Sequence, residues 1–263
     1  MGSCIDKPAL VLLTGWGVSR HVWTALGETG LAAFDVMALD LRDFFPVAWR
    51  EEGDDSRLSR LIDNLPKTAH LVGWSLGGML AVLLASRYPH RIRSLTLVAT
   101  NAVFQRGGDW KAGMAPVVFA QFRRAFIATP ERAWRRFIGL HFQGMENARA
   151  LTRRMIQLSQ AEDIDYGTLR AGLEWLAQAD VRDAVASLDV PTIAIQGGLD
   201  VITPVAAVHA LGALNPHIER MVIDDSGHAP FVDHPREVMS WLRQLASEGD
   251  APIGPHNQSP VRM

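Results

Sequence analysis

The chain has 263 residues, of which 48% are hydrophobic, enough to bury a large core in one or two domains. Its formal net charge of −2 argues against a nucleic-acid-binding protein, because such proteins concentrate basic residues on one face. The sequence shows neither a signal-like leading segment nor an uncharged apolar stretch of about 18 residues. Since Cys4 is the single cysteine, we expect a cytoplasmic protein with no membrane segment and no internal disulfide.

Six short apolar runs, mostly rich in β-branched residues and bounded by turn residues, predict buried strands. In chain order they lie at 8–17, 35–41, 69–74, 92–100, 191–197 and 219–225. Segments with a helical spacing of apolar residues, such as 79–87 and 205–214, separate several of these strands. Strands that alternate with helices favour an α/β fold with a mostly parallel central sheet and helices on both faces.

The alternation stops between residues 102 and 185, where apolar side chains recur at helical spacing without a convincing strand. Thr129 before Pro130 is typical of a helix start, and a last helix is expected from Pro235 to about Ala246. The inserted segment predicts helices at 112–127, 130–141, 147–160 and 165–178. We therefore expect a core formed by 1–101 and 186–248, a helical cap at 102–185, and a disordered tail at 249–263.

The segment Gly73-Trp74-Ser75-Leu76-Gly77 has the pattern G-x-S-x-G and lies between a predicted strand and a predicted helix. A sharp strand-to-helix turn exposes a serine hydroxyl, and side chains at the two glycine positions would collide with neighbouring backbone. Free N–H groups at the start of a helix also stabilise negative charge on a substrate oxygen. Ser75 is therefore a candidate nucleophile, although the same residues would suit an ordinary helix N-cap.

A serine nucleophile needs a histidine as general base and a carboxylate that orients the histidine. Asp200 follows the strand at 191–197, and His228 lies in a glycine-containing loop after the next strand. We predict that Ser75, Asp200 and His228 form a catalytic triad at one edge of the sheet. A helix cap for Asp200 and a buried structural role for His228 are the alternatives, and the rival acids are Asp180, Asp189, Asp224 and Asp225. The spacing of the other histidines matches no metal motif, so no metal is expected.

An oxyanion in the reaction needs two N–H donors. Leu76, the residue after the nucleophile, supplies one, and Trp16 in the glycine-lined turn after the first strand is the expected second donor. Trp16 and Trp74 would also flank the serine with apolar surface and contact the substrate. Ordinary core packing is the alternative reading of both tryptophans.

Together these features resemble the α/β-hydrolase superfamily, over residues 8–246. Within it, the stretches LLTGWGVSRHVW, LVGWSLGGMLA and SGHAPFVDHP are similar to the family of carboxylesterases that hydrolyse the methyl ester of pimeloyl-acyl carrier protein in biotin synthesis. The resemblance implies a serine esterase with Ser75, Asp200 and His228 as the triad, Trp16 and Leu76 as the oxyanion hole, and neither a metal nor another cofactor.

The resemblance also implies that an acyl carrier protein is the partner and that arginines of the cap bind it. Residues 120–155 contain eight arginines but only Glu131 and Glu146 as acids, a local excess of six positive charges. Such a face steers an acidic partner, and a solvated helix surface is the alternative. We expect a monomer without nucleic-acid or membrane partners. The candidate carrier-binding residues are Arg123, Arg124, Arg132, Arg135, Arg136, Arg149, Arg153 and Arg154.

Two departures from the superfamily pattern leave the shape of the substrate pocket open. Thr14 stands where histidine is usual, and DLRDFFP at 40–46 replaces a D-L-P-G-F-G-type loop. Phe142 is a candidate substrate contact in the cap. Either an acyl pocket or core packing would explain Phe44, Phe45, Phe119, Phe122 and Phe142.

Three functions remain open from the sequence. The first is the carrier-bound methyl esterase, the second is a general carboxylesterase, thioesterase or lactonase of the same fold, and the third is a catalytically silent carrier-protein-binding module. A dehalogenase or epoxide hydrolase with an aspartate nucleophile is disfavoured, because Ser75 occupies the nucleophile position.

Overall fold

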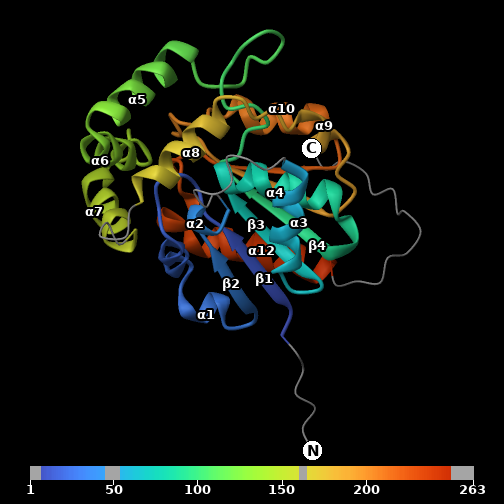
Figure 1. The fold of residues 1–263 in the computed structure, drawn as a ribbon. Coiled ribbons are helices and arrows are strands. Elements are labelled where there is room, and N and C mark those ends of the chain that lie inside the picture. Colours follow the sequence, from blue (N-terminus) through green and yellow to red (C-terminus); the bar gives the residue numbers. More distant parts are fainter. Residues whose placement is uncertain (1–6, 45–53, 160–164, 250–263) are drawn as a thin grey trace, which may run out of the picture.

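The computed structural model describes residues 7–44, 54–159 and 165–249. Within these ranges six strands form one sheet in the order β2-β1-β3-β4-β5-β6, and each neighbouring pair is parallel (Figure 1). The predicted α/β fold with a mostly parallel sheet is thus confirmed. The strands are β1 (Ala9–Leu13), β2 (Asp35–Leu39), β3 (Ala69–Trp74), β4 (Ile92–Val98), β5 (Thr192–Gly197) and β6 (Glu219–Ile223).

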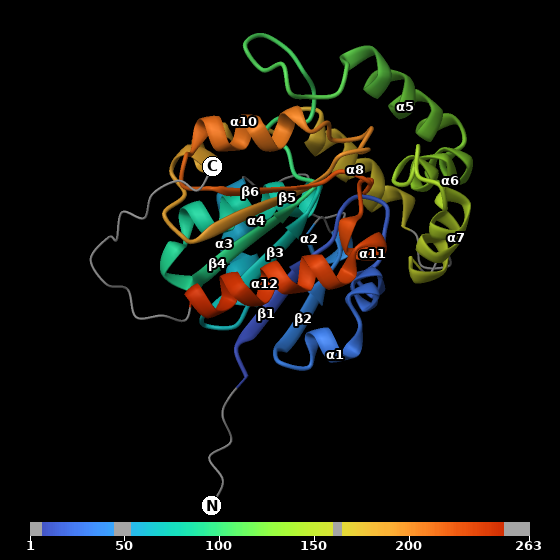
Figure 2. The same cartoon turned by 180° about the vertical axis from the view of Figure 1, so that it is seen from behind.

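Helices cover both faces of the sheet, as expected (Figures 1 and 2). Helix α4 (Leu76–Arg87) packs on β3 and β4, with α3 (Asp54–Asp63) and α9 (Arg182–Ala186) beside it. On the opposite face, α12 (Pro235–Gly249) lies across β4 and β5 next to the 3-10 helix η1 (Arg20–Leu26). The remaining elements of the core are α1 (Glu28–Leu31), α2 (Leu41–Phe44), η3 (Pro89–Arg91), α10 (Ala206–Leu214) and α11 (Pro230–Asp233).

The four helices predicted between β4 and β5 are present and stand beside the sheet rather than on its faces (Figure 2). Thr129 is the N-cap residue of its helix as predicted, but its hydroxyl donates to the Ala125 carbonyl of the preceding helix (3.3 Å) instead of capping. Asp165 does cap its helix, accepting from the Gly167 N–H (2.9 Å). The helices are α5 (Pro116–Ala128), α6 (Pro130–Leu140), α7 (Ala148–Leu158) and α8 (Tyr166–Leu176).

Several predicted boundaries differ from the structure, most clearly at the first strand, at the first cap helix, which begins at Pro116 rather than at residue 112, and at the last helix. The first strand ends at Leu13, because the following residues turn away from the sheet and Gly17 has a φ of +85°. Helix α12 continues to Gly249, past the expected end near Ala246. The rest of the predicted disordered tail, 250–263, lies outside the described residues, and the division into core and cap at 102 and 185 stays a prediction. In the described ranges no helix combines the length and apolar character needed to cross a membrane.

The glycines of the G-x-S-x-G segment allow α4 to start directly against β1 and β3. A Cβ atom on Gly73 would lie 2.5 Å from the Gly78 Cα, and one on Gly77 would lie 2.5 Å from the Leu13 carbonyl oxygen. Both distances are far below van der Waals contact, so side chains at these positions would force the helix away from the sheet. The steric reason that the sequence suggested for these two glycines is therefore confirmed.

We expect Gly73→Ala to lower the free energy of unfolding by about 1–3 kcal/mol, because the added methyl group overpacks a rigid backbone contact. Gly139→Ala is the matched control, since nothing lies within 4 Å of a Cβ at this position in α6. Alanine there should raise the free energy of unfolding by roughly 0.5–1 kcal/mol through helix propensity. Urea denaturation of both variants measures the difference, and equal stabilities would contradict this account of the turn.

Candidate active site

Ser75 occupies a strained turn between β3 and α4. Its φ of 55° and ψ of −118° are unusual for a residue with a side chain, and the serine is half-buried. The conformation is held at both ends, because its N–H donates to the Val98 carbonyl (2.9 Å) and its carbonyl accepts from Gly78 (3.0 Å) and Met79 (3.2 Å). The residue predicted to be the nucleophile is therefore held in a strained backbone conformation.

Asp200 and His228 form a buried pair, as the sequence predicted. The His228 Nδ1 lies 2.7 Å from the Asp200 Oδ2, which also accepts from the Gln196 amide (2.8 Å). The other carboxylate oxygen, Oδ1, accepts from the Ile202 and Thr203 N–H groups at 2.8 and 2.9 Å. An ionised carboxylate can only accept, so His228 carries its proton on Nδ1 and presents a lone pair at Nε2.

The Nε2 atom of His228 is buried and has no hydrogen-bond partner among the described residues. Those residues also contain no hydrogen bond between Ser75 Oγ and His228 Nε2. The two residues are nevertheless linked, because the indole of Trp74, directly before Ser75, donates to the His228 carbonyl (2.7 Å). Catalytic hydrogen bonds are often long or misaligned without substrate, so this geometry is compatible with a serine and base that engage when an ester binds.

The cap also contacts the base, through a histidine that sequence reasoning passed over. The His141 carbonyl, just past the end of α6, accepts from the His228 N–H (2.8 Å), and the two imidazole centroids are 5.1 Å apart. Burial is the main cause that lowers the pKa of His141, to about 3, and the charge that His228 bears when protonated lowers it further, so the His141 imidazole is neutral. Its Nδ1 bonds the Phe137 carbonyl (2.9 Å). In the sequence, His141 was merely the expected last residue of a cap helix.

The predicted oxyanion donors lie next to the serine because β1 and β3 are neighbours in the sheet. A Cβ on Gly15 would lie 3.2 Å from the Ser75 Cβ, which places the turn after β1 against the nucleophile. Among the described residues, the N–H groups of Trp16 and Leu76 donate to no oxygen. Both are thus available to an oxyanion, and their catalytic role stays a prediction.

The three predicted substrate contacts are all deeply buried. Trp16 is 2% exposed, and Trp74 and Phe142 are 0% exposed. The Trp16 ring packs edge-on against Phe122, Phe126 and Phe137 of the cap, at centroid distances of 5.5, 5.3 and 4.8 Å. The packing alternative considered for the tryptophans therefore describes their present surroundings, and substrate contact by Trp16, Trp74 and Phe142 stays a prediction.

Comparison with known proteins agrees with this geometry. Residues 61–235 match the family described as alpha/beta hydrolase fold. The chain is 33% identical over 241 residues to the pimeloyl-[acyl-carrier protein] methyl ester esterase of Aeromonas salmonicida, covering 90% of this chain and 94% of that one. It is 35% identical over 244 residues to the esterase of the same name from Cronobacter sakazakii, with 90% and 92% covered. The chain belongs to this esterase family of α/β hydrolases.

The solved structures of other α/β hydrolases show how widely the fold extends. A bromoperoxidase from Bacillus anthracis superimposes with a TM-score of 0.80 at 19% identity, covering 92% of this chain and 93% of that one. At that identity the likeness shows the fold alone. The resemblance drawn from the G-W-G turn, the G-W-S-L-G segment and the H-A-P-F run is confirmed by the family match.

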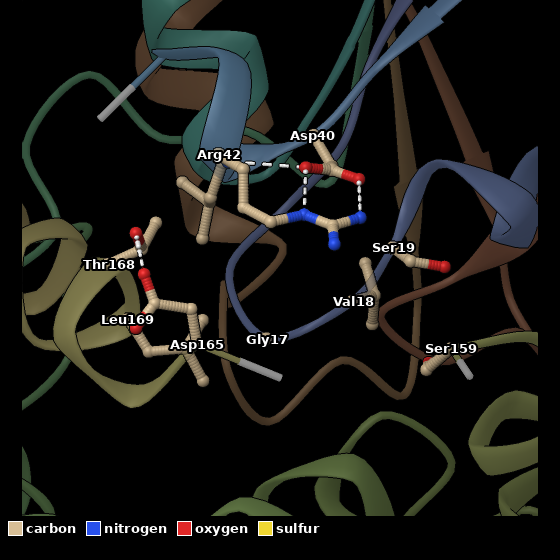
Figure 3. A pocket seen from close by; sticks show the side chains of 10 residues that line it. Gly17, Val18, Ser19, Asp40, Arg42, Ser159, Asp165, Thr168 and Leu169 are labelled. Atoms are coloured by element: carbon tan, nitrogen blue, oxygen red, sulfur yellow. Dashed lines mark hydrogen bonds and ion pairs between the residues drawn. The ribbon is translucent and has the colours of Figure 1, made fainter. Parts of the chain in front are cut away.

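The loop that departs from the superfamily pattern builds an ion-pair network beside the cap. Asp40 is buried and accepts from the Arg42 guanidinium at 3.1 and 2.9 Å, with Arg20 at 3.4 Å (Figure 3). Burial alone would raise the pKa of Asp40, but the hydrogen bonds and charge of Arg42 outweigh burial and lower it. Thr14 is fully buried, and its hydroxyl has no partner among the described residues.

The network borders a cavity of about 30 Å³, which has room for about one water molecule and not for a substrate. Of the phenylalanines considered for an acyl pocket, Phe45 and the Phe44 side chain lie outside the described residues. Phe119 packs on Phe104, with the ring centroids 5.0 Å apart. The cavity is lined from the core by Gly17, Val18, Ser19, Asp40, Leu41 and Arg42, and from the cap by Ser159, Asp165, Thr168 and Leu169 (Figure 3).

The cap arginines lie on α5, α6 and α7, which stand together at one side of the molecule (Figure 2). Arg123 is half-buried and the other seven are exposed. Arg135 pairs with Glu131 (3.0 Å), and Arg154 donates to the Val232 carbonyl (3.2 Å). No ion pair with a described residue is made by Arg124, Arg132, Arg136, Arg149 or Arg153.

In the described ranges, no group of three or more His, Cys, Asp and Glu side chains could hold a metal.

We expect Asp200→Asn to lower kcat for ester hydrolysis by about 10³–10⁴-fold while leaving the fold intact. Oδ1 is held by two N–H groups, so the new amide nitrogen would face the His228 Nδ1 as a donor and favour the tautomer with a protonated Nε2. Asp180→Asn is the matched control, because Asp180 was a rival acid and lies in an exposed pair with Arg182. Loss of activity in both variants would contradict the assignment of Asp200.

Proposed function

We propose that this protein is a serine carboxylesterase that hydrolyses the methyl ester of pimeloyl-acyl carrier protein, yielding pimeloyl-acyl carrier protein and methanol in biotin synthesis. The observation that carries the proposal is the buried Asp200–His228 pair beside the Ser75 turn, in a chain of the esterase family. We place the enzyme in the cytoplasm, which a chain with one cysteine suits.

In the proposed reaction, Ser75 Oγ attacks the ester carbonyl while His228 Nε2 takes its proton. Asp200 orients the imidazole and stabilises the cation that forms. The Trp16 and Leu76 N–H groups bind the oxyanion of the tetrahedral intermediate. The intermediate collapses as His228 returns the proton to the methoxy oxygen, so that methanol leaves and an acyl-serine ester remains.

The second half of the proposed reaction repeats the same steps with water. His228 takes a proton from the water that attacks the acyl-serine carbonyl, and the oxyanion forms again in the same N–H pair. The C–O bond to serine then breaks, and His228 gives the proton to Ser75 Oγ. The free carboxylic acid leaves, and no metal or redox cofactor enters the balance.

Carrier binding is assigned to the exposed arginines of α6 and α7. Residues 120–155 carry an excess of six positive charges in a chain whose net charge is −2, so this side of the molecule attracts an acidic protein. Several of these arginines have no acid to neutralise them in the described structure. That arrangement favours a partner outside the chain over a self-contained network of ion pairs.

We expect kcat/KM for carrier-bound pimeloyl methyl ester to exceed that for free dimethyl pimelate by at least about tenfold, because charge steering raises the rate of encounter. Steady-state release of methanol with purified protein measures both values. A preference for the free ester would contradict the proposal and favour the general esterase.

Ser75→Ala separates the enzyme from a catalytically silent carrier-binding module. The proposal predicts that this variant loses turnover by about 10⁴-fold or more. It also predicts that the wild-type chain, and not Ser75→Ala, restores growth without biotin to a strain that lacks its own esterase. Rescue by both would show that the serine has no catalytic role.

We expect charge reversal of the four unpaired arginines of α6 and α7 to lower kcat/KM at least about tenfold for the carrier-bound ester and to leave the free ester unchanged. Added salt should weaken the wild-type preference in the same direction. Arg220→Glu on the edge strand β6, outside the cap, is the control. An equal loss with both substrates would point to a damaged site rather than a lost docking surface. The four residues are Arg132, Arg136, Arg149 and Arg153.

A further inference from the structure

The turn that carries the expected oxyanion donor is bonded to two different cap helices through indole groups. The Trp16 Nε1 donates to the Leu169 carbonyl of α8 (2.7 Å). In the opposite direction, the Trp134 Nε1 of α6 donates to the Gly17 carbonyl (2.5 Å). Both bonds are buried, and Trp134 is 1% exposed. A turn of the core is therefore held by the cap from two sides.

The surroundings of these bonds leave the turn little room to move. At its start, the Thr14 N–H is bonded to the Leu39 carbonyl of β2 (3.1 Å), which fixes that end to the sheet. At its far end, Gly17 has a φ of +85°, and a Cβ there would lie 3.3 Å from the Trp134 ring. Gly172 of α8 approaches Trp16 as closely, since its Cβ would lie 3.0 Å from the Trp16 Cδ1.

We propose that Trp134 is a positioning residue of the esterase reaction, which holds the Gly17 carbonyl from the cap and thereby aims the Trp16 N–H at the oxyanion. This inference rests on the proposed function, and in particular on the oxyanion role of Trp16. The donor and the bonded carbonyl are one residue apart in the chain. The peptide group between Trp16 and Gly17 joins the two, so we expect a released Gly17 carbonyl to let this turn rotate, including the Trp16 N–H.

The effect of such a rotation falls on the transition state. An oxyanion bears full charge only in the tetrahedral intermediate, so a misplaced donor weakens intermediate binding far more than ground-state binding of the ester. Trp134 touches no reacting atom in this scheme and acts through Gly17 and Trp16. The expected signature is a loss of kcat with little change of KM, together with an equal loss of affinity for a tetrahedral adduct. A smaller active fraction of enzyme would lower apparent kcat alone and leave that affinity unchanged.

The test compares Trp134→Phe with Trp110→Phe, using p-nitrophenyl acetate as a substrate that needs the triad but no carrier protein. Each variant keeps an aromatic ring and loses one indole bond, because the Trp110 Nε1 donates to the Val103 carbonyl (3.1 Å), outside the oxyanion turn. We expect Trp134→Phe to lower kcat about tenfold, with KM changed less than about twofold. The affinity for a trifluoromethyl ketone, which forms a tetrahedral adduct with the serine, should fall by the same factor. Trp110→Phe should retain wild-type kcat and KM.

The outcomes separate this inference from the proposed function. If the wild-type chain does not hydrolyse the ester, or Ser75→Ala hydrolyses it equally well, the esterase itself is overturned and the role of Trp134 with it. If the wild type is active and Trp134→Phe retains its kcat, or raises KM alone, the positioning role alone is overturned. Should Trp134→Phe fail to fold, Gly17→Ala presses on the same indole from the other side, and it should show the same loss of kcat.

Discussion

The buried pairing of Asp200 with His228 is the interaction on which the arrangement of the site depends. A carboxylate removed from water is stable where hydrogen bonds replace its hydration, and three of its four donors come from the β5 strand and the loop after it. The carboxylate is therefore fixed independently of the histidine, and its last acceptor position selects the imidazole nitrogen that carries the proton. The loop that carries His228 is held in place by hydrogen bonds. Its partners include the Trp74 indole directly before Ser75, the Asp233 carboxylate of α11 and the His141 carbonyl of the cap.

Through His141, the cap contacts the residue proposed as the catalytic base. Helix α6 has 11 residues and presents arginines outward, while Trp134 and Phe137 face inward against the turn after β1. The Arg135 guanidinium lies 6.0 Å from the Trp134 ring centre, so an arginine of the outer face is close to the indole that bonds the turn after β1. A partner bound to the arginines and the oxyanion turn would thus contact the same rigid element. In such an arrangement, carrier docking and transition-state stabilisation are linked through one helix.

The strands, the cap helices and the residues of the predicted triad could be found from the sequence, because each has a local signal. Buried parallel strands are apolar runs, and the G-x-S-x-G segment is a steric requirement of one turn. The contacts between the cap and the core had no such signal in the sequence. Trp134 lies in α6 and His141 directly after it, where any buried aromatic residue would give the same pattern, and a hydrogen bond to a residue far away in the chain leaves no trace in spacing. Thr129 shows the same limit, since its cap position was predictable but its choice of the Ala125 carbonyl was not.

The seam between core and cap is also where this chain differs from the usual sequence pattern of its superfamily. Arg42 and Asp40 build an ion pair in the departing loop, and the lining of the cavity beside them includes Gly17, whose carbonyl accepts from the Trp134 indole. A triad shared by many chemistries cannot by itself select an ester, so the selection has to come from residues that shape the approach to it. The Trp134 indole bond holds the turn after β1, so a change there would reach the proposed oxyanion donor without touching the triad residues. Under the proposed function, contacts between the core and the cap would therefore influence both substrate choice and the geometry of the oxyanion donors.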